Sequence, residues 1–140
     1  MALKVWWNSD ADDGVRVESS DELVELLTQV SGTVGYPIMF ELVDAENPYA
    51  HPILDVGVSG DRGALYFTGP GAEDGCFSWN SSAEATDELV HFDYMNNTRE
   101  FPQTSLHDLE VVWQVCAEFA ENVDERPAVL SWQPRRAVAR

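Results

Sequence analysis

Positive charge is what this sequence has least of. Its 140 residues include 8 Lys+Arg against 25 Asp+Glu, which gives a formal net charge of -17 at pH 7. A net charge of magnitude about 2–8 is enough to keep a small domain soluble. An acidic surface repels phosphate, so direct binding of nucleic acid and attachment to anionic lipid are disfavoured. Two explanations stay open: a solvated, aggregation-resistant or halophilic surface, or electrostatic attraction of a basic partner.

Cysteines and long apolar segments are also scarce. Cys76 and Cys116 are too few and too far apart for a disulfide framework or a metal box. No run approaches the roughly 18 apolar residues of a membrane span. The first residues lack the apolar core of a signal peptide. We therefore expect a cytoplasmic protein that is not attached to a membrane.

The motifs of catalysis and metal binding are missing as well. His51, His91 and His107 do not lie at the short spacings that metal sites use. The sequence has no G-x-S-x-G elbow, no Cys–His motif and no glycine-rich loop that opens a helix. Carboxylates are so numerous that counting them cannot single out an acid–base pair. We expect no enzymatic activity, no cofactor and no metal.

What is present is enough for a folded core. The chain is 44% hydrophobic and 11% aromatic, far from a disordered composition. Its length suits one domain, which we expect to span residues 1–140. Residues 134–140 include Arg135, Arg136 and Arg140 and are expected to form a flexible basic tail.

Two amphipathic helices are predicted. The first is capped by Ser19 or Ser20, and Gly32 is expected to end it. Ser105 is expected to cap the second, with Asp108 in a capping-box relation, and Pro127 to end it. The apolar positions at steps of three and four are Leu23, Leu26, Leu27 and Val30 in the first helix, and Leu106, Leu109, Val112, Trp113, Cys116, Phe119, Ala120 and Val123 in the second.

Short strand-like segments precede, separate and follow these helices. They are Leu3–Trp7, Ile38–Val43, Ile53–Val58, Ala64–Thr68, Cys76–Trp79, Leu89–Tyr94 and Ala128–Trp132. Where no helix separates two strands, the strands should pair antiparallel. The sequence thus predicts an α+β fold: a mainly antiparallel sheet of about six or seven strands, with both helices packed on one face.

Two aromatic residues are candidates for exposed anchors. Alternation along the first strand places Trp7 on one face and Trp6 on the other, so that one of the two should be at least partly exposed, and Trp6 is the candidate. Tyr49 lies in an Asn-Pro-Tyr-Ala loop. Exposed aromatic side chains among acids make good anchors for a protein interface.

A set of short motifs covers most of the chain. They are Gly35-Tyr36-Pro37, Leu54-Asp55-Val56-Gly57-Val58, Phe92-Asp93-Tyr94, Glu100-Phe101-Pro102, and Leu130-Ser131-Trp132-Gln133-Pro134. Together they resemble the Imm1 family of bacterial immunity proteins, from about Asp21 to Pro134. One departure is Met95-Asn96-Asn97, which stands where the family has a glycine-rich turn.

The resemblance implies a specific role. Family members have an α+β fold and are encoded beside secreted polymorphic toxins. Their partners are often nucleic-acid-modifying toxins, particularly deaminases, which they block in the cytoplasm of the producing cell. By resemblance, this chain is expected to bind one basic toxin domain in a 1:1 complex and to occlude its active site. An acidic adaptor or nucleic-acid mimic without a toxin partner is the alternative.

The expected binding residues lie on loops and acidic faces. They form three groups: Asp10, Asp12 and Asp13 with Trp6; Asp44, Glu46 and Tyr49; and Glu73 with Asp74. The motif residues are instead expected to hold the fold together: Phe92, Asp93, Tyr94, Pro102 and Trp132.

Overall fold

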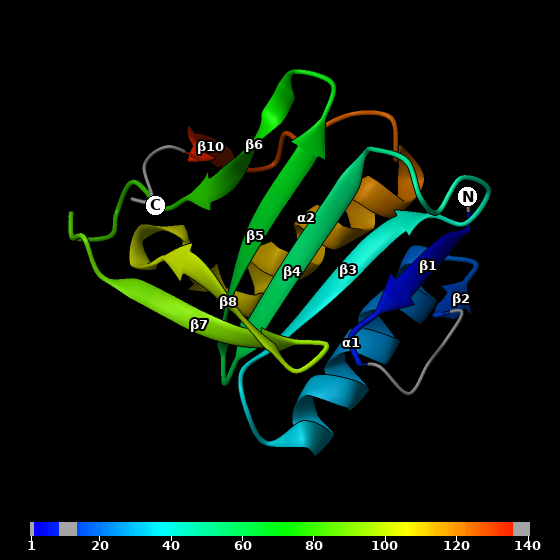
Figure 1. Ribbon diagram of the computed structural model, residues 1–140, viewed down its shortest axis with the longest axis horizontal. Coiled ribbons are helices and arrows are strands. Elements are labelled where there is room, and N and C mark those ends of the chain that lie inside the picture. The colour runs from blue at the N-terminus through cyan, green and yellow to red at the C-terminus, as the bar shows by residue number, and fades with distance from the viewer. Residues whose placement is uncertain (1, 9–13, 136–140) are drawn as a thin grey trace.

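The computed structural model describes residues 2–8 and 14–135, and within them the chain forms one large sheet backed by two helices (Figure 1). In chain order the elements are β1 (Leu3–Trp6), β2 (Val15–Val17), α1 (Ser20–Val34), β3 (Ile38–Asp44), β4 (Ile53–Ser59), β5 (Arg62–Gly69), β6 (Ala72–Trp79), β7 (Leu89–Tyr94), β8 (Asn97–Pro102), the short 3₁₀ turn η1 (Gln103–Ser105), β9 (His107–Asp108), α2 (Leu109–Glu121) and β10 (Ser131–Pro134). The α+β prediction is confirmed, although the described residues form ten strands rather than six or seven.

Helix α1 begins as its sequence predicts. The Ser19 hydroxyl accepts a hydrogen bond from the Glu22 amide at 3.1 Å, and the Glu22 carboxylate accepts one from the Glu18 amide at 2.9 Å. These reciprocal bonds satisfy donors that the first turn leaves without partners. The helix does not end at Gly32 but at Gly35, whose φ of 72° is left-handed. Glycine adopts that conformation at little cost.

The predicted start of α2 is wrong. Ser105 lies in η1, and its hydroxyl donates to the carbonyl of Pro102 at 2.6 Å. His107 and Asp108 then pair with β5 as a short strand, so the helix cannot begin before Leu109. Backbone pairing with the sheet therefore prevails over the capping pattern. The helix also ends before Pro127, at Glu121.

The sheet follows the path β10-β6-β5-β4-β3-β1-β2, and neighbours along it are antiparallel. Its outermost strands are short, with three residues in β2 and four in β10. Strand β7 makes one parallel pairing with β3, at Ile38 and Asp93, and its hairpin partner is β8. The strands that the sequence analysis did not predict are β2, β8 and β9, which are short or largely polar. The last strand, β10, begins at Ser131 rather than at the predicted Ala128.

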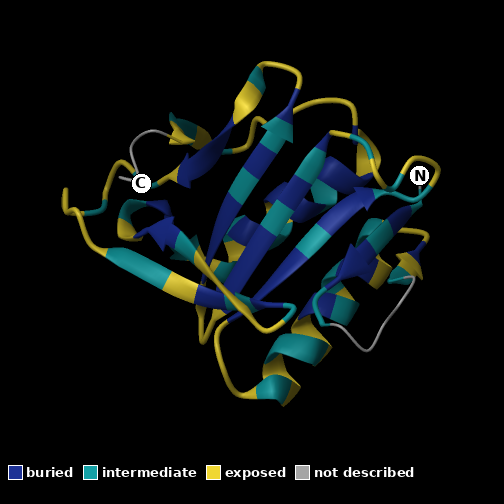
Figure 2. Cartoon of the chain, viewed as in Figure 1, coloured by how far each residue is buried: buried dark blue, intermediate teal, exposed yellow. Residues whose placement is uncertain are grey.

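The two faces of the sheet are covered differently. Both helices pack on one face, and apolar side chains from α1, α2 and the central strands are fully buried there (Figure 2). The β7–β8 hairpin crosses the other face (Figure 1). The Phe92 ring lies directly on β4, because Gly57 has no Cβ: an added Cβ would lie 2.7 Å from that ring. The hairpin covers this open face only in part, and the uncovered part holds polar groups.

Candidate partner-binding surface

One end of the sheet carries two of the three predicted acidic groups. Ile53 pairs with Thr68, so the β3–β4 loop and the β5–β6 turn leave the sheet at the same end. A shallow cavity of about 340 Å³ lies between them, lined in part by His51 and Glu73. We call this end, formed by Asp44, Glu46, Tyr49, Glu73 and Asp74, the loop-end surface.

Backbone turns fix the shape of the β3–β4 loop. The amide of Asn47 donates to the carbonyl of Asp44 at 3.1 Å, and the amide of Ala50 donates to the carbonyl of Asn47 at 3.2 Å. The Asp44 carboxylate accepts a further bond from the Glu46 amide at 2.9 Å. Such Asx geometry uses a side chain in place of a backbone acceptor. The loop therefore holds Tyr49 out in a defined position.

Tyr49 is the most exposed large apolar side chain in the described part of the chain, at 90%. The Trp6 ring lies beneath it, with the two ring centroids 6.4 Å apart. Trp6 itself is 8% exposed, so the expectation that it is the exposed tryptophan is wrong. Trp7, on the opposite face, is the partly exposed one and packs on Phe40. Trp6 is thus placed to support Tyr49.

The charges of the loop-end surface are only partly compensated. Glu46 lies 3.6 Å from Arg16, which also pairs with Glu18. Glu73 and Asp74 are both exposed, and the Glu73 carboxylate accepts a bond from the Gly71 amide at 3.3 Å. The third predicted group, Asp10, Asp12 and Asp13, lies outside the described residues.

The motif residues make contacts inside the fold. Phe92 meets the Phe101 ring edge-on at a centroid distance of 5.1 Å, and the backbone of Asp93 pairs with β3. Pro102 is buried. The indole of Trp132 donates to the carbonyl of Pro127 at 2.8 Å and packs against Phe67.

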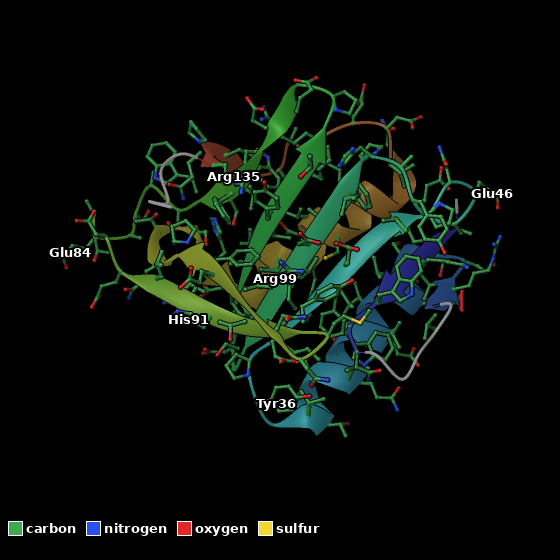
Figure 3. The ribbon with its side chains drawn as sticks, in the orientation of Figure 1. Tyr36, Glu46, Glu84, His91, Arg99 and Arg135 are labelled. Carbon is green, nitrogen blue, oxygen red and sulfur yellow. The ribbon has the colours of Figure 1, made fainter. Side chains whose placement is uncertain are left out.

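A second polar site, which the sequence analysis did not find, lies on the open face of the sheet (Figure 3). Strand register places Glu41 beside Asp55, and Asp55 beside Tyr66. The Tyr94 hydroxyl donates to the Glu41 carboxylate at 3.2 Å. The Arg99 guanidinium lies over the Tyr94 ring, 5.4 Å from its centroid. The lining of a cavity of about 210 Å³ includes Glu41, Asp55, Tyr66, Phe77, Arg99, Phe101 and Arg135, and we call this cavity the sheet-face pocket.

Asp55 is the unusual group of this pocket. Its Oδ1 is closed to solvent and has no hydrogen-bond partner among the described residues. Burial, and next the negative charge of Glu41, raise the pKa of Asp55 well above its ordinary value, and Arg99 offsets this only in part. Burial and then Glu41 also raise the pKa of the Tyr94 hydroxyl. The sequence does contain a signal for this site, because Glu41 and Asp55 are acids flanked on both sides by apolar residues within their strands.

The described residues offer no site for a metal. No group of three or more His, Cys, Asp or Glu side chains among them could hold an ion.

Within residues 2–8 and 14–135, no helix has the length and apolarity needed to cross a membrane. A carboxylate-rich surface with an exposed, supported aromatic side chain has the features of a protein-binding domain.

The comparison with family models then assigns the chain. The model described as immunity protein Imm1 matches residues 11–134, which is most of the chain. The chain belongs to the Imm1 family and is thus an immunity protein directed against a toxin. Membership suggests a role in binding rather than in catalysis. No curated protein matches the sequence significantly.

Proposed function

We propose that this chain neutralises a basic, nucleic-acid-modifying toxin, a nucleic-acid deaminase, by forming a 1:1 complex in the cytoplasm that occludes its active site. The observation that carries the proposal is a net charge of -17 on a member of an immunity-protein family. The resemblance set out above supplies the deaminase as the kind of toxin, and charge supplies the basic partner.

Electrostatics favours this partner. A toxin that acts on DNA or RNA needs a cationic cleft to hold phosphates. An acidic inhibitor complements that cleft and associates faster through long-range steering. The net charge of -17 already includes all 8 Lys+Arg, so the long-range field stays strongly negative after every cation is counted.

Charge alone does not give tight binding, which also needs a buried anchor. Tyr49 supports that part of the proposal, since it is 90% exposed and rests on Trp6 in a loop fixed by hydrogen bonds. A pre-ordered aromatic side chain loses little conformational entropy on binding. We propose the loop-end surface as the centre of the interface, with Asp10, Asp12 and Asp13 as a further acidic group.

The test is to purify the product of the neighbouring toxin gene and measure its binding and activity. We expect a 1:1 complex, inhibition of deamination at stoichiometric ratio, and an association rate that falls steeply between about 0.05 and 0.2 M salt. A toxin that binds but has another activity would remove only the deaminase assignment. Absence of any complex would overturn the proposal and favour the acidic adaptor or nucleic-acid mimic.

A further inference from the structure

The sheet-face pocket has the form of a binding slot. Its floor is a row of side chains across neighbouring strands, Glu41 on β3, Asp55 on β4 and Tyr66 on β5, fixed by the register of the sheet. Strand β8 of the hairpin forms one wall, and Arg99 projects from it over the middle of the sheet (Figure 3). The volume of about 210 Å³ far exceeds the roughly 10–15 Å³ needed to hold one water.

The floor carries two neighbouring carboxylates, and the lining cations Arg99 and Arg135 do not hydrogen-bond to Asp55 Oδ1. Asp55 Oδ1 is buried and has no hydrogen-bond partner among the described residues. A polar atom buried in this way costs free energy in the unbound protein. Asp55 lies directly across from a second carboxylate, Glu41, whose repulsion adds to that cost. A positively charged hydrogen-bond donor that enters the pocket would supply the missing hydrogen bond to Asp55 and reduce the repulsion between the two carboxylates.

The walls favour a planar cation. Tyr66 and Phe77 pack with ring centroids 4.7 Å apart, and Phe101 packs against Phe77 at 5.3 Å. A guanidinium group combines bidentate donation to carboxylates with stacking on aromatic rings, which an ammonium group does less well. Arg99 already shows this chemistry within the chain, since its guanidinium lies over Tyr94.

A bound divalent metal is the less suitable occupant. Ca²⁺ takes about 6–8 oxygen ligands and Mg²⁺ needs near-octahedral geometry. The described residues include no cluster of three or more acidic, histidine or cysteine side chains that could hold an ion.

We propose that the sheet-face pocket accepts one arginine side chain of the toxin, whose guanidinium donates to the carboxylates of Glu41 and Asp55. The proposal rests on the proposed function, because it names a second contact point for the same partner. It adds a specific, partly desolvated contact to the long-range attraction of the acidic surface.

The first experiment uses the isolated protein and needs no toxin. N-acetyl-arginine amide is titrated into ¹³C-labelled protein while the side-chain carboxyl signals are followed by NMR. We expect saturable shifts of Glu41 and Asp55 with a Kd on the order of millimolar. The uncharged citrulline analogue should give none, and N-acetyl-lysine amide should bind more weakly. Equal shifts at acids all over the surface, or selective shifts with Mg²⁺ or Ca²⁺ alone, would overturn the proposal.

The second experiment uses Asp55→Asn and Glu41→Gln, which remove charge at nearly constant shape. Glu121→Gln, on the exposed side of α2 across the sheet, is the matched control. We expect each pocket variant to weaken probe binding at least about tenfold and toxin binding about 30-fold or more, mainly through faster dissociation. The control should match the wild type. Unchanged toxin binding by both pocket variants would contradict the proposal.

Stability separates binding from a structural role. A carboxylate that only supports the fold should, when neutralised, lower the unfolding midpoint, whereas a buried charge awaiting a partner should not. We expect Asp55→Asn to unfold at an equal or higher temperature than the wild type. If the wild type binds no toxin, the proposed function fails whatever the probe does. If it binds toxin and both variants bind equally well, the slot alone fails.

Discussion

At the residue scale, exposure and support single out Tyr49. It is the one large aromatic side chain in the described part of the chain that is almost wholly in solvent, and a buried tryptophan lies beneath it. A solvent-exposed ring contributes little to folding, so its presence on an ordered loop is better explained by contact with a partner.

Replacing Tyr49 by Ala should therefore separate binding from stability. We expect toxin affinity to fall by about 2 kcal/mol, a typical loss for an interface hot spot, while the unfolding midpoint stays within error. Tyr36→Ala is the control, because Tyr36 is 50% exposed and lies away from the loop-end surface (Figure 3). Titration calorimetry and thermal unfolding measure the two effects. Equal losses of affinity in both variants would remove Tyr49 from the interface.

The buried carboxylate Asp55 makes stability depend on pH. The pKa of Asp55 is higher in the folded chain than in the unfolded one, so the protonated form of Asp55 favours folding. This stabilising contribution to the free energy of unfolding is fully present below the ordinary pKa of 3.8 and is lost as pH rises through the folded pKa. Asp55→Asn removes that loss. We expect the variant's advantage in unfolding free energy to grow from near zero at acidic pH to at least about 1 kcal/mol at pH 7. Urea titrations across this range measure it, and an advantage independent of pH would contradict the assignment.

At the scale of elements, the β7–β8 hairpin decides how much of the open sheet face is accessible. The Phe92 ring of this hairpin packs directly over Gly57 of β4. The hairpin thereby forms one wall of the sheet-face pocket, although few of its backbone bonds reach the main sheet.

Gly57→Ala should loosen this element. The added methyl group would overlap the Phe92 ring, and overpacking of this kind costs about 1–3 kcal/mol. Gly32→Ala is the matched control, since nothing lies within 4 Å of its position in α1, and removing a helical glycine should stabilise by about 0.5–1 kcal/mol. Denaturant unfolding gives both values. Hydrogen exchange should show faster exchange in β7 and β8 of the Gly57 variant alone, and uniform protection would argue against a shifted hairpin.

The helices and the central antiparallel strands could be predicted from the sequence because periodicity and turn residues are local signals. The start of α2 could not, since the pairing of Asp108 with Arg62 is a contact between distant segments. The sheet-face pocket could not be predicted for the same reason, since it is formed by residues that are distant in sequence. Glu41 and Asp55 become neighbours only when the register of β3 and β4 is known. For the loop-end surface, the sequence placed Asp44, Glu46 and Tyr49 in one loop but could not show that Glu73 shares their end of the sheet.

At the scale of the whole molecule, the acid excess acts on folding and on binding with opposite signs. Ion pairs with Arg in the described part involve the acids Glu18, Glu46 and Asp108, and Glu100 lies 3.3 Å from His91, which is charged only when protonated. The remaining repulsion weakens the compact state, and salt screens it.

Salt should thus stabilise the free protein and slow the formation of its complex. We expect the unfolding temperature to rise between about 0.01 and 0.2 M NaCl, where the screening length shortens from roughly 30 Å to less than 10 Å. Over the same range the association rate with toxin should fall by tenfold or more. Thermal scans and stopped-flow mixing measure the two trends. An unfolding temperature that does not change with salt would show that self-repulsion is minor.

The brevity of the two outermost strands bears on how the protein behaves when it is abundant. A long, flat outer strand exposes a row of unpaired amides and carbonyls on which another copy can build a fibre. Here three residues in β2 and four in β10 offer little template, and like charges on approaching copies add a barrier. At these two strands the short edges and the like charge disfavour self-association, which suits an inhibitor that is kept in excess over its toxin.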